Sequence, residues 1–256
     1  MSSWKDDYSF QTTLLVTLLI LLIASFVPRP ATAAELKEKG QPMDTDMVKL
    51  GPEISTEEVQ RVLVDKSPPV IDVRSEKEYA IAHIPGSINI YEKETDAIMN
   101  RFPDKGAALI IYCNGPFCYK VKRVAEQLIK RGYTNVRRYQ LGLPVWRAFG
   151  NTVQTDMLGF KYIFAADKTA VFVDARSKEE FIFGTIPGAV NVQAGEAEAA
   201  NTDGRLPYTD KGTRIIVFAD KPEKARVVAE EIAQKAFWNS SYFGGTFDEL
   251  KQSGLW

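Results

Sequence analysis

The reactive chemistry of this chain depends on two cysteines, Cys113 and Cys118, because its 256 residues contain no other thiol and only one histidine. Two cysteines and one histidine are too few for a tetrahedral zinc site built from those ligands. A cysteine thiolate is a strong nucleophile, and it is favoured where backbone N–H groups converge at a helix N-terminus. The two thiols therefore indicate nucleophilic cysteine chemistry or thiol–disulfide exchange, without a metal.

Cys113 begins a loop that lies between an apolar segment at 108–112 and an amphipathic segment at 121–131. We expect a strand to run into the cysteine and a helix to follow, so that the loop amides curl around the sulfur as an anion-binding nest. Gly115 permits backbone conformations that other residues resist, and Pro116 stiffens the turn. These features predict a lowered pKa for the Cys113 thiol. Besides the cysteines, the candidate loop residues are Asn114, Gly115, Pro116, Phe117, Tyr119 and Lys120.

The elements that must hold this loop belong to a repeated unit. Residues 70–90 read VIDVRSEKEYAIAHIPGSINI and residues 172–192 read FVDARSKEEFIFGTIPGAVNV, with eight identities at a constant offset of 102 residues. A repeat of about 100 residues matches a common domain size. We therefore predict a first domain at 52–150, a linker at 151–164 and a second domain at 165–256.

Apolar, strand-like segments alternate with helix-like segments through the first domain. The predicted helices lie at 55–64, 76–82, 121–131 and from 141 onward, and the predicted strands at 70–73, 87–90, 108–112 and 136–139. This alternation predicts an α/β fold with a mostly parallel central sheet and helices on both faces. Ligands of such sheets bind beyond the carboxyl ends of the strands, and Cys113 lies at one of those ends.

Three features together resemble the rhodanese family of sulfurtransferases. They are the DVR, EY, HIPG and N pattern within 72–89, the Cys-led loop between a strand and a helix, and the closing LGLPVWRAFG. The resemblance extends over both units and implies two tandem rhodanese-like domains, each with a five-stranded parallel sheet. It also implies that Cys113 carries a sulfane sulfur as a persulfide. The sulfur would pass from a donor such as thiosulfate or a persulfide to a thiophilic acceptor, either of which is a small molecule or a protein.

The second domain contains no thiol. Ala219 aligns with Cys113, and the loop that follows is two residues shorter. Since a persulfide needs a cysteine, we predict that the second domain is inactive and that the first is the active one.

Cys118 follows Cys113 at a C-x4-C spacing, which is less usual for the resembling family. It could resolve a Cys113 persulfide or sulfenic acid by forming a disulfide, or it could be a packing residue. Five residues of separation allow disulfide geometry without dictating it, so both interpretations stay open.

Asp72 and Arg74 match the DVR motif of the family. Because the same pair recurs in the unit without a cysteine, as Asp174 and Arg176, we predict a structural ion pair rather than direct contact with substrate. His83 corresponds to a threonine in the second unit. We therefore expect it to belong to the turn and not to act as a general base.

Two other classes of function compete with sulfur transfer. One is thiol redox chemistry that cycles Cys113 and Cys118 between dithiol and disulfide. The other is a non-catalytic rhodanese-like binding module. We expect no cofactor, because the sequence contains neither a glycine-rich dinucleotide loop nor a P-loop.

Composition argues against nucleic-acid binding, and the N-terminus predicts where in the cell the protein acts. The chain is 45% apolar and 25% charged with a net charge of −1, a globular balance without the basic footprint that nucleic-acid binding needs. Residues 14–27 form an apolar run followed by the small-x-small pattern Ala31-Thr32-Ala33. We predict a signal peptide at 1–33, a linker at 34–51 and export to a bacterial periplasm. An uncleaved membrane anchor is the alternative.

Overall fold

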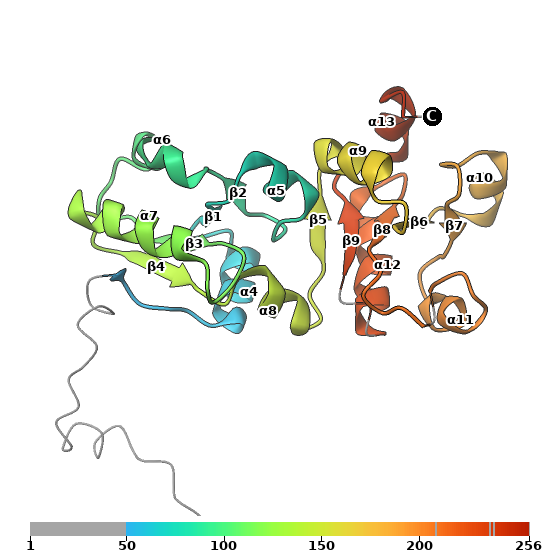
Figure 1. The fold of residues 1–256 in the computed structure, drawn as a ribbon, viewed down its shortest axis with the longest axis horizontal. Helices are drawn as coiled ribbons and strands as arrows, with labels where there is room; N and C mark the ends of the chain where they lie inside the picture. Colours follow the sequence, from blue (N-terminus) through green and yellow to red (C-terminus); the bar gives the residue numbers. More distant parts are fainter. Residues whose placement is uncertain (1–49, 208, 236, 238, 256) are drawn as a thin grey trace, which may run out of the picture. The chain divides into compact units, whose positions relative to one another are not determined.

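The computed structural model describes residues 50–256 except 208, 236, 238 and 256 (Figure 1). These residues belong to one compact unit. The predicted signal peptide at 1–33, and all but the last two residues of the predicted linker at 34–51, lie outside them. Within the described residues, no helix is both long enough and apolar enough to cross a membrane.

The first domain is a parallel sheet of four strands in the order β2-β1-β3-β4. Its elements are α4 (Thr56–Asp65), β1 (Val70–Asp72), α5 (Glu76–Ile81), β2 (Ile88–Asn89), the 3-10 helix η2 (Glu92–Glu94), α6 (Thr95–Arg101), β3 (Leu109–Tyr112), α7 (Tyr119–Lys130), β4 (Val136–Tyr139) and α8 (Gly142–Ala148). Each predicted helix and strand of this domain is present, with ends that differ by one or two residues. The structure adds η2 and α6, which the sequence reading did not include.

The second domain is a parallel sheet of five strands in the order β5-β9-β8-β6-β7. Its elements are β5 (Val153–Thr155), α9 (Met157–Ala166), β6 (Val171–Asp174), α10 (Lys178–Phe183), β7 (Val190–Asn191), α11 (Ala197–Thr202), β8 (Ile215–Phe218), α12 (Pro222–Gln234), β9 (Ser240–Phe243) and α13 (Phe247–Gln252). The segment 151–164, which we expected to be a linker, therefore contains a strand of this sheet and most of a helix. It belongs to the second domain because β5 finds its hydrogen-bonding partner in β9.

The expected fifth strand of the first domain is reduced to an isolated parallel bridge between Glu53 and Arg138 at the β4 edge. Two backbone bonds form it, from Ile54 N to Arg138 O at 3.0 Å and from Arg138 N to Pro52 O at 2.9 Å. The first sheet therefore has four strands and one bridge where five strands were expected.

β3 is buried on both faces, which fixes the position of the residue that follows it. Leu109 and Ile111 pack toward α7, whereas Ile110 and Tyr112 pack toward α4 and α8. Alternate side chains of a strand point to opposite faces, so helices on both sides hold this strand. The carboxyl end of β3, directly before Cys113, is consequently a rigid part of the molecule.

The end of α5 packs against the start of the second domain. His83 and Gln154 exchange two backbone hydrogen bonds, of 3.0 and 2.9 Å, and Asp156 N donates to Ala80 O at 2.8 Å. Gly159 lies so close to Ala80 O that a Cβ there would be nearer than 3.0 Å. Residues 80–83, which include the first residue of HIPG, are therefore part of the contact between the first and the second domain.

Candidate active site

Cys113 directly follows β3, the strand that lies between β1 and β4 in the sheet. Only 1% of the residue is exposed. Its carbonyl accepts a hydrogen bond from Leu143 N at 3.3 Å. Ala219 occupies the same place after β8, and its carbonyl accepts from Phe247 N at 2.8 Å. The two positions are structurally equivalent, as the alignment predicted, and the thiol is present only in the first domain.

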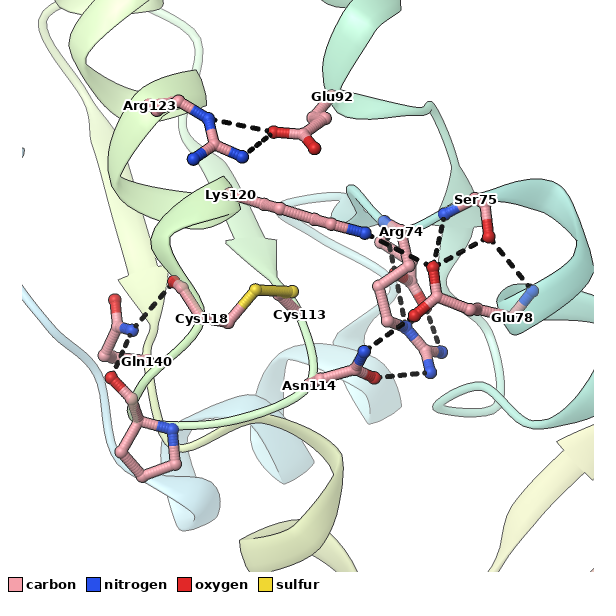
Figure 2. The surroundings of a disulfide bond; sticks show 12 residues. Arg74, Ser75, Glu78, Glu92, Cys113, Asn114, Cys118, Lys120, Arg123 and Gln140 are labelled. Carbon is pink, nitrogen blue, oxygen red and sulfur yellow. Dashed lines mark hydrogen bonds and ion pairs between the residues drawn. A yellow bond between two sulfur atoms is a disulfide. The ribbon is translucent and has the colours of Figure 1, made fainter.

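Cys113 and Cys118 form a disulfide, with their Cα atoms 6.3 Å apart (Figure 2). Cys118 occupies the N-cap position of α7, so the bond joins the end of a strand to the start of the next helix. The N–H of Cys118 donates to Gly115 O at 2.9 Å, within the loop, and not to sulfur. The lowered pKa expected for Cys113 concerns the reduced protein and stays a prediction.

Two glycines and a glutamine hold the loop in shape. Gly115 has φ 131° and Gly142 has φ 63°, a region that other residues rarely adopt. A Cβ on Gly142 would come closer than 3.0 Å to Cys113 O, so α8 approaches the loop directly. The Nε2 atom of Gln140 donates to Pro116 O at 2.9 Å and to Cys118 O at 3.3 Å (Figure 2). Gln140 and Gly142 were not among the site residues predicted from the sequence. They could have been predicted from their position, because they directly follow the fourth strand and therefore lie at the same edge of the parallel sheet as the cysteine loop.

Asp72 and Arg74 form the buried ion pair that the repeat predicted. Arg74 Nη2 lies 2.5 Å from Asp72 Oδ2, and Nη2 also donates to Ala82 O at 2.6 Å. Burial acts to lower the pKa of Arg74, but the bonds and charge of Asp72 outweigh it and raise that pKa. Arg176 and Asp174 repeat the pair at 2.6 Å.

Arg74 makes one contact toward the loop that its counterpart does not share. Its Nη1 donates to Asn114 Oδ1 at 3.0 Å. Arg176 instead lies over the ring of Phe247, at 3.4 Å from the ring centre. Arg74 therefore supports the cysteine loop as well as the scaffold.

Glu78 was not among the predicted site residues, although its carboxylate is the centre of a network at the loop (Figure 2). It accepts hydrogen bonds from Ser75 Oγ at 2.7 Å, Asn114 Nδ2 at 2.7 Å and Lys120 Nζ at 3.3 Å. Burial acts to raise the pKa of Glu78, but these bonds outweigh it and lower the pKa to about 2. Glu78 is therefore an anion at every physiological pH.

Three basic residues lie at the start of α7, and two of them, Lys120 and Arg123, are paired with acidic groups. The third, Lys122, lies over the Tyr119 ring at 5.9 Å from its centre. Lys120 lies 3.3 Å from Glu78, and Arg123 lies 2.5 Å from Glu92. Phe117 and Tyr119, by contrast, are 93% and 68% exposed. The outer surface of the loop is therefore aromatic, and two of the nearby cations, Lys120 and Arg123, are paired with carboxylates.

His83 forms a bridge with Gln154 directly before the Pro85-Gly86 turn, rather than lying in the turn itself as predicted. The residue is 1% exposed, its ring stacks on Tyr79 at 3.8 Å, and its Nδ1 lies 2.9 Å from Tyr79 O. Burial lowers the pKa of His83, which keeps the ring neutral. These contacts hold the ring in place, and the absence of a general-base role stays a prediction.

The described residues contain no group of three or more histidine, cysteine, aspartate or glutamate side chains placed to hold a metal ion.

The fold and the site together define a class: two α/β domains of parallel sheet, one of which presents a cysteine loop after its central strand. The rhodanese-like domain family matches this chain twice, at residues 55–149 and 163–253. The chain belongs to the rhodanese family and contains two tandem rhodanese domains.

Several known proteins are similar to parts of this chain. A Saccharomyces cerevisiae protein named thiosulfate:glutathione sulfurtransferase is 32% identical over 111 residues, which are 38% of this chain and 78% of that protein. A thiosulfate sulfurtransferase structure from Pseudomonas aeruginosa is 19% identical, with a TM-score of 0.38. The match covers 80% of this chain and 43% of that one. The human single-domain sulfurtransferase TSTD1 is 24% identical with a TM-score of 0.33, and the match covers 38% of this chain and 95% of that one.

Proposed function

We propose that this protein is a sulfurtransferase whose Cys113, once reduced, carries sulfane sulfur as a persulfide. The observation that carries the proposal is the cysteine itself. It is held at the carboxyl end of β3 by a structured loop, in one of two rhodanese domains, and the other domain has alanine at that place. Ligands of parallel α/β sheets bind at this edge.

The transfer needs two displacements. With thiosulfate as donor, the Cys113 thiolate attacks the outer, sulfane sulfur, the sulfur–sulfur bond of thiosulfate breaks, and sulfite leaves with the electron pair. The acceptor nucleophile then attacks the outer sulfur of the persulfide and regenerates the thiolate. Both steps conserve charge and need no further oxidant or reductant once the disulfide has been reduced.

The donor and acceptor we propose are thiosulfate or a low-molecular-weight persulfide, and a small thiol. The name of the yeast relative supports thiosulfate and glutathione as a first pair. Two of the three cations at the start of α7, Lys120 and Arg123, are paired with carboxylates, which reduces the electrostatic attraction that a divalent anion gains at this loop. We therefore expect a persulfide donor to load the protein at least as fast as thiosulfate.

Intact mass spectrometry of the reduced full chain tests the proposal. After reductant is removed and thiosulfate or glutathione persulfide is added, we expect Cys118→Ser, which has no second thiol, to gain one sulfur atom on Cys113. Cyanide should remove that sulfur, and Cys113→Ser should gain none. If neither donor loads the protein or its Cys118→Ser variant, the proposal is wrong.

Thiol–disulfide exchange is the second candidate, and the Cys113–Cys118 bond favours it. It predicts that the reduced protein loses two hydrogen atoms on exposure to a disulfide substrate, and that Cys118→Ser abolishes the activity.

We also propose that the protein is exported to a periplasm, which rests on the apolar run and the small-x-small pattern of the sequence. N-terminal sequencing of the protein from fractionated cells should give a chain that begins after Ala33 or Ala34. Recovery of the intact N-terminus in the membrane fraction would indicate an anchor instead.

A further inference from the structure

Cys118 is placed to react with Cys113 and with no other described cysteine. The two belong to one short loop, they are bonded in the structure, and their Cα atoms are 6.3 Å apart. Cys118 also begins α7, whose buried face packs against the β3 strand that precedes Cys113. The distance between the two sulfur atoms is therefore controlled by the core of the first domain.

A side chain outside the loop, that of Gln140, also holds the backbone of Cys118 in place. Gln140, directly after β4, donates from Nε2 to the carbonyls of both Pro116 and Cys118. Its own carbonyl accepts from Arg138 Nη1 at 3.0 Å, which fixes the amide orientation. The equivalent position after β9 is Gly244, in the domain that has no cysteine. The glutamine and the two cysteines thus occur together in one domain, and all three are missing from the other.

We propose that Cys118 is an internal acceptor that releases the sulfane sulfur of Cys113 as hydrosulfide. This inference rests on the proposed function, because it begins from the Cys113 persulfide. The Cys118 thiolate attacks the Sγ atom of Cys113, the bond between Sγ and the outer sulfur breaks, and HS⁻ leaves with the electron pair. The outer sulfur is reduced to sulfide while Cys118 is oxidised into the disulfide. A second step, by an external dithiol reductant, restores both thiols.

The attack falls on the inner sulfur because that is the atom that Cys118 reaches in the structure. Cys113 is almost fully buried, so a bulky external thiol must enter past the loop to compete. Cys118 is already inside, and an intramolecular thiol on a short tether acts at an effective concentration of about 1 mM or more. An external acceptor at micromolar concentration would therefore lose to Cys118.

A single-turnover reaction of the reduced full chain with thiosulfate, without oxygen or excess reductant, separates the two proposals. Sulfite reports loading of Cys113, and hydrosulfide reports release by Cys118. We expect the unaltered chain to give both products in nearly equal amounts and to lose two hydrogen atoms. Cys118→Ser should give sulfite alone and keep one added sulfur. Glutathione persulfide, with intact mass as the readout, is the second donor.

Gln140→Ala is the matched variant that keeps both thiols. Both rates are measured for this variant, and the rate of hydrosulfide release relative to that of sulfite formation should fall about 3- to 10-fold, because Cys118 is less well positioned. If the unaltered chain keeps its persulfide as long as Cys118→Ser does, the internal acceptor is refuted while the sulfurtransferase proposal stands. If Cys118→Ser gains no sulfur from either donor, both proposals fall.

Discussion

Replacing Glu78 with glutamine tests whether the network at the loop holds the first domain together. The Glu78 carboxylate accepts bonds from Ser75, Asn114 and Lys120, and its pKa falls from an ordinary 4.5 to about 2. At about 1.4 kcal/mol per pKa unit, that fall corresponds to roughly 3 kcal/mol for a fully buried group. Because the side chain is 36% exposed, solvent screening reduces the expected contribution to about 1–2 kcal/mol.

The sign of the pH dependence follows from the lowered pKa. A carboxylate whose pKa is lower in the folded state stabilises that state above its unfolded pKa of 4.5, and the stabilisation is lost as the pH falls toward 2. At pH 7 we therefore expect Glu78→Gln to lower the free energy of unfolding by about 1–2 kcal/mol. At pH 3 the difference between the two proteins should be less than half as large.

Urea unfolding of the oxidised full chain at pH 7 and pH 3, followed by circular dichroism, measures both values. Glu180→Gln is the control, since Glu180 makes the same capping bonds with Ser177 in α10. Lys224 in α12, which aligns with Lys120, pairs with Asp220. The control should cost about 0.5–1 kcal/mol, as for a helix cap alone. A difference for Glu78→Gln that is the same at both pH values would refute the reasoning.

Five further substitutions test the scaffold, four of them by urea unfolding and one by hydrogen exchange. Asp72→Asn and Asp174→Asn should each cost about 3–5 kcal/mol, because each leaves a buried arginine without its anion, but only Asp72→Asn should slow sulfur loading. Equal loading by both variants would contradict the role of Arg74 at the loop. Gly142→Ala should cost about 3 kcal/mol because its Cβ would meet the Cys113 carbonyl, whereas Gly150→Ala, with a similar φ and open surroundings, should cost about 1 kcal/mol. Gly159→Ala should speed hydrogen exchange at residues 80–83, since its Cβ would displace the Ala80 carbonyl; unchanged exchange would mean that α9 shifts freely.

The sequence predicted the parts of the fold whose signal is local. β3, α7 and β4 each combine an apolar pattern with a clear boundary, and all three lie where they were expected. The Asp–Arg pair was predictable because it occurs twice, once without the cysteine. Repetition showed that the pair belongs to the scaffold.

The parts that the sequence did not predict depend on partners far away in the chain. β5 has three residues, and it is a strand only because β9 pairs with it nearly ninety residues later. α9 is apolar on most sides, so it lacks the periodic pattern that marks an amphipathic helix. The bond between Asn114 and Glu78 joins residues 36 positions apart and appears only once the sheet brings α5 beside the loop.

The second domain allows a last prediction, because it has the same kind of fold as the first domain but a shorter loop without cysteine after its central strand. Restoring one thiol with Ala219→Cys, in a chain that carries Cys113→Ser, places a cysteine after the central strand of the second sheet. That cysteine has a shorter loop, no resolving thiol, no counterpart of Gln140, and a lysine already paired with Asp220. If the loop and not the fold confers reactivity, thiosulfate should load this chain about 100-fold or more slowly than it loads Cys118→Ser. Loading at a comparable rate would mean that the end of a central strand suffices, and that the network around Cys113 stabilises the domain without tuning its chemistry.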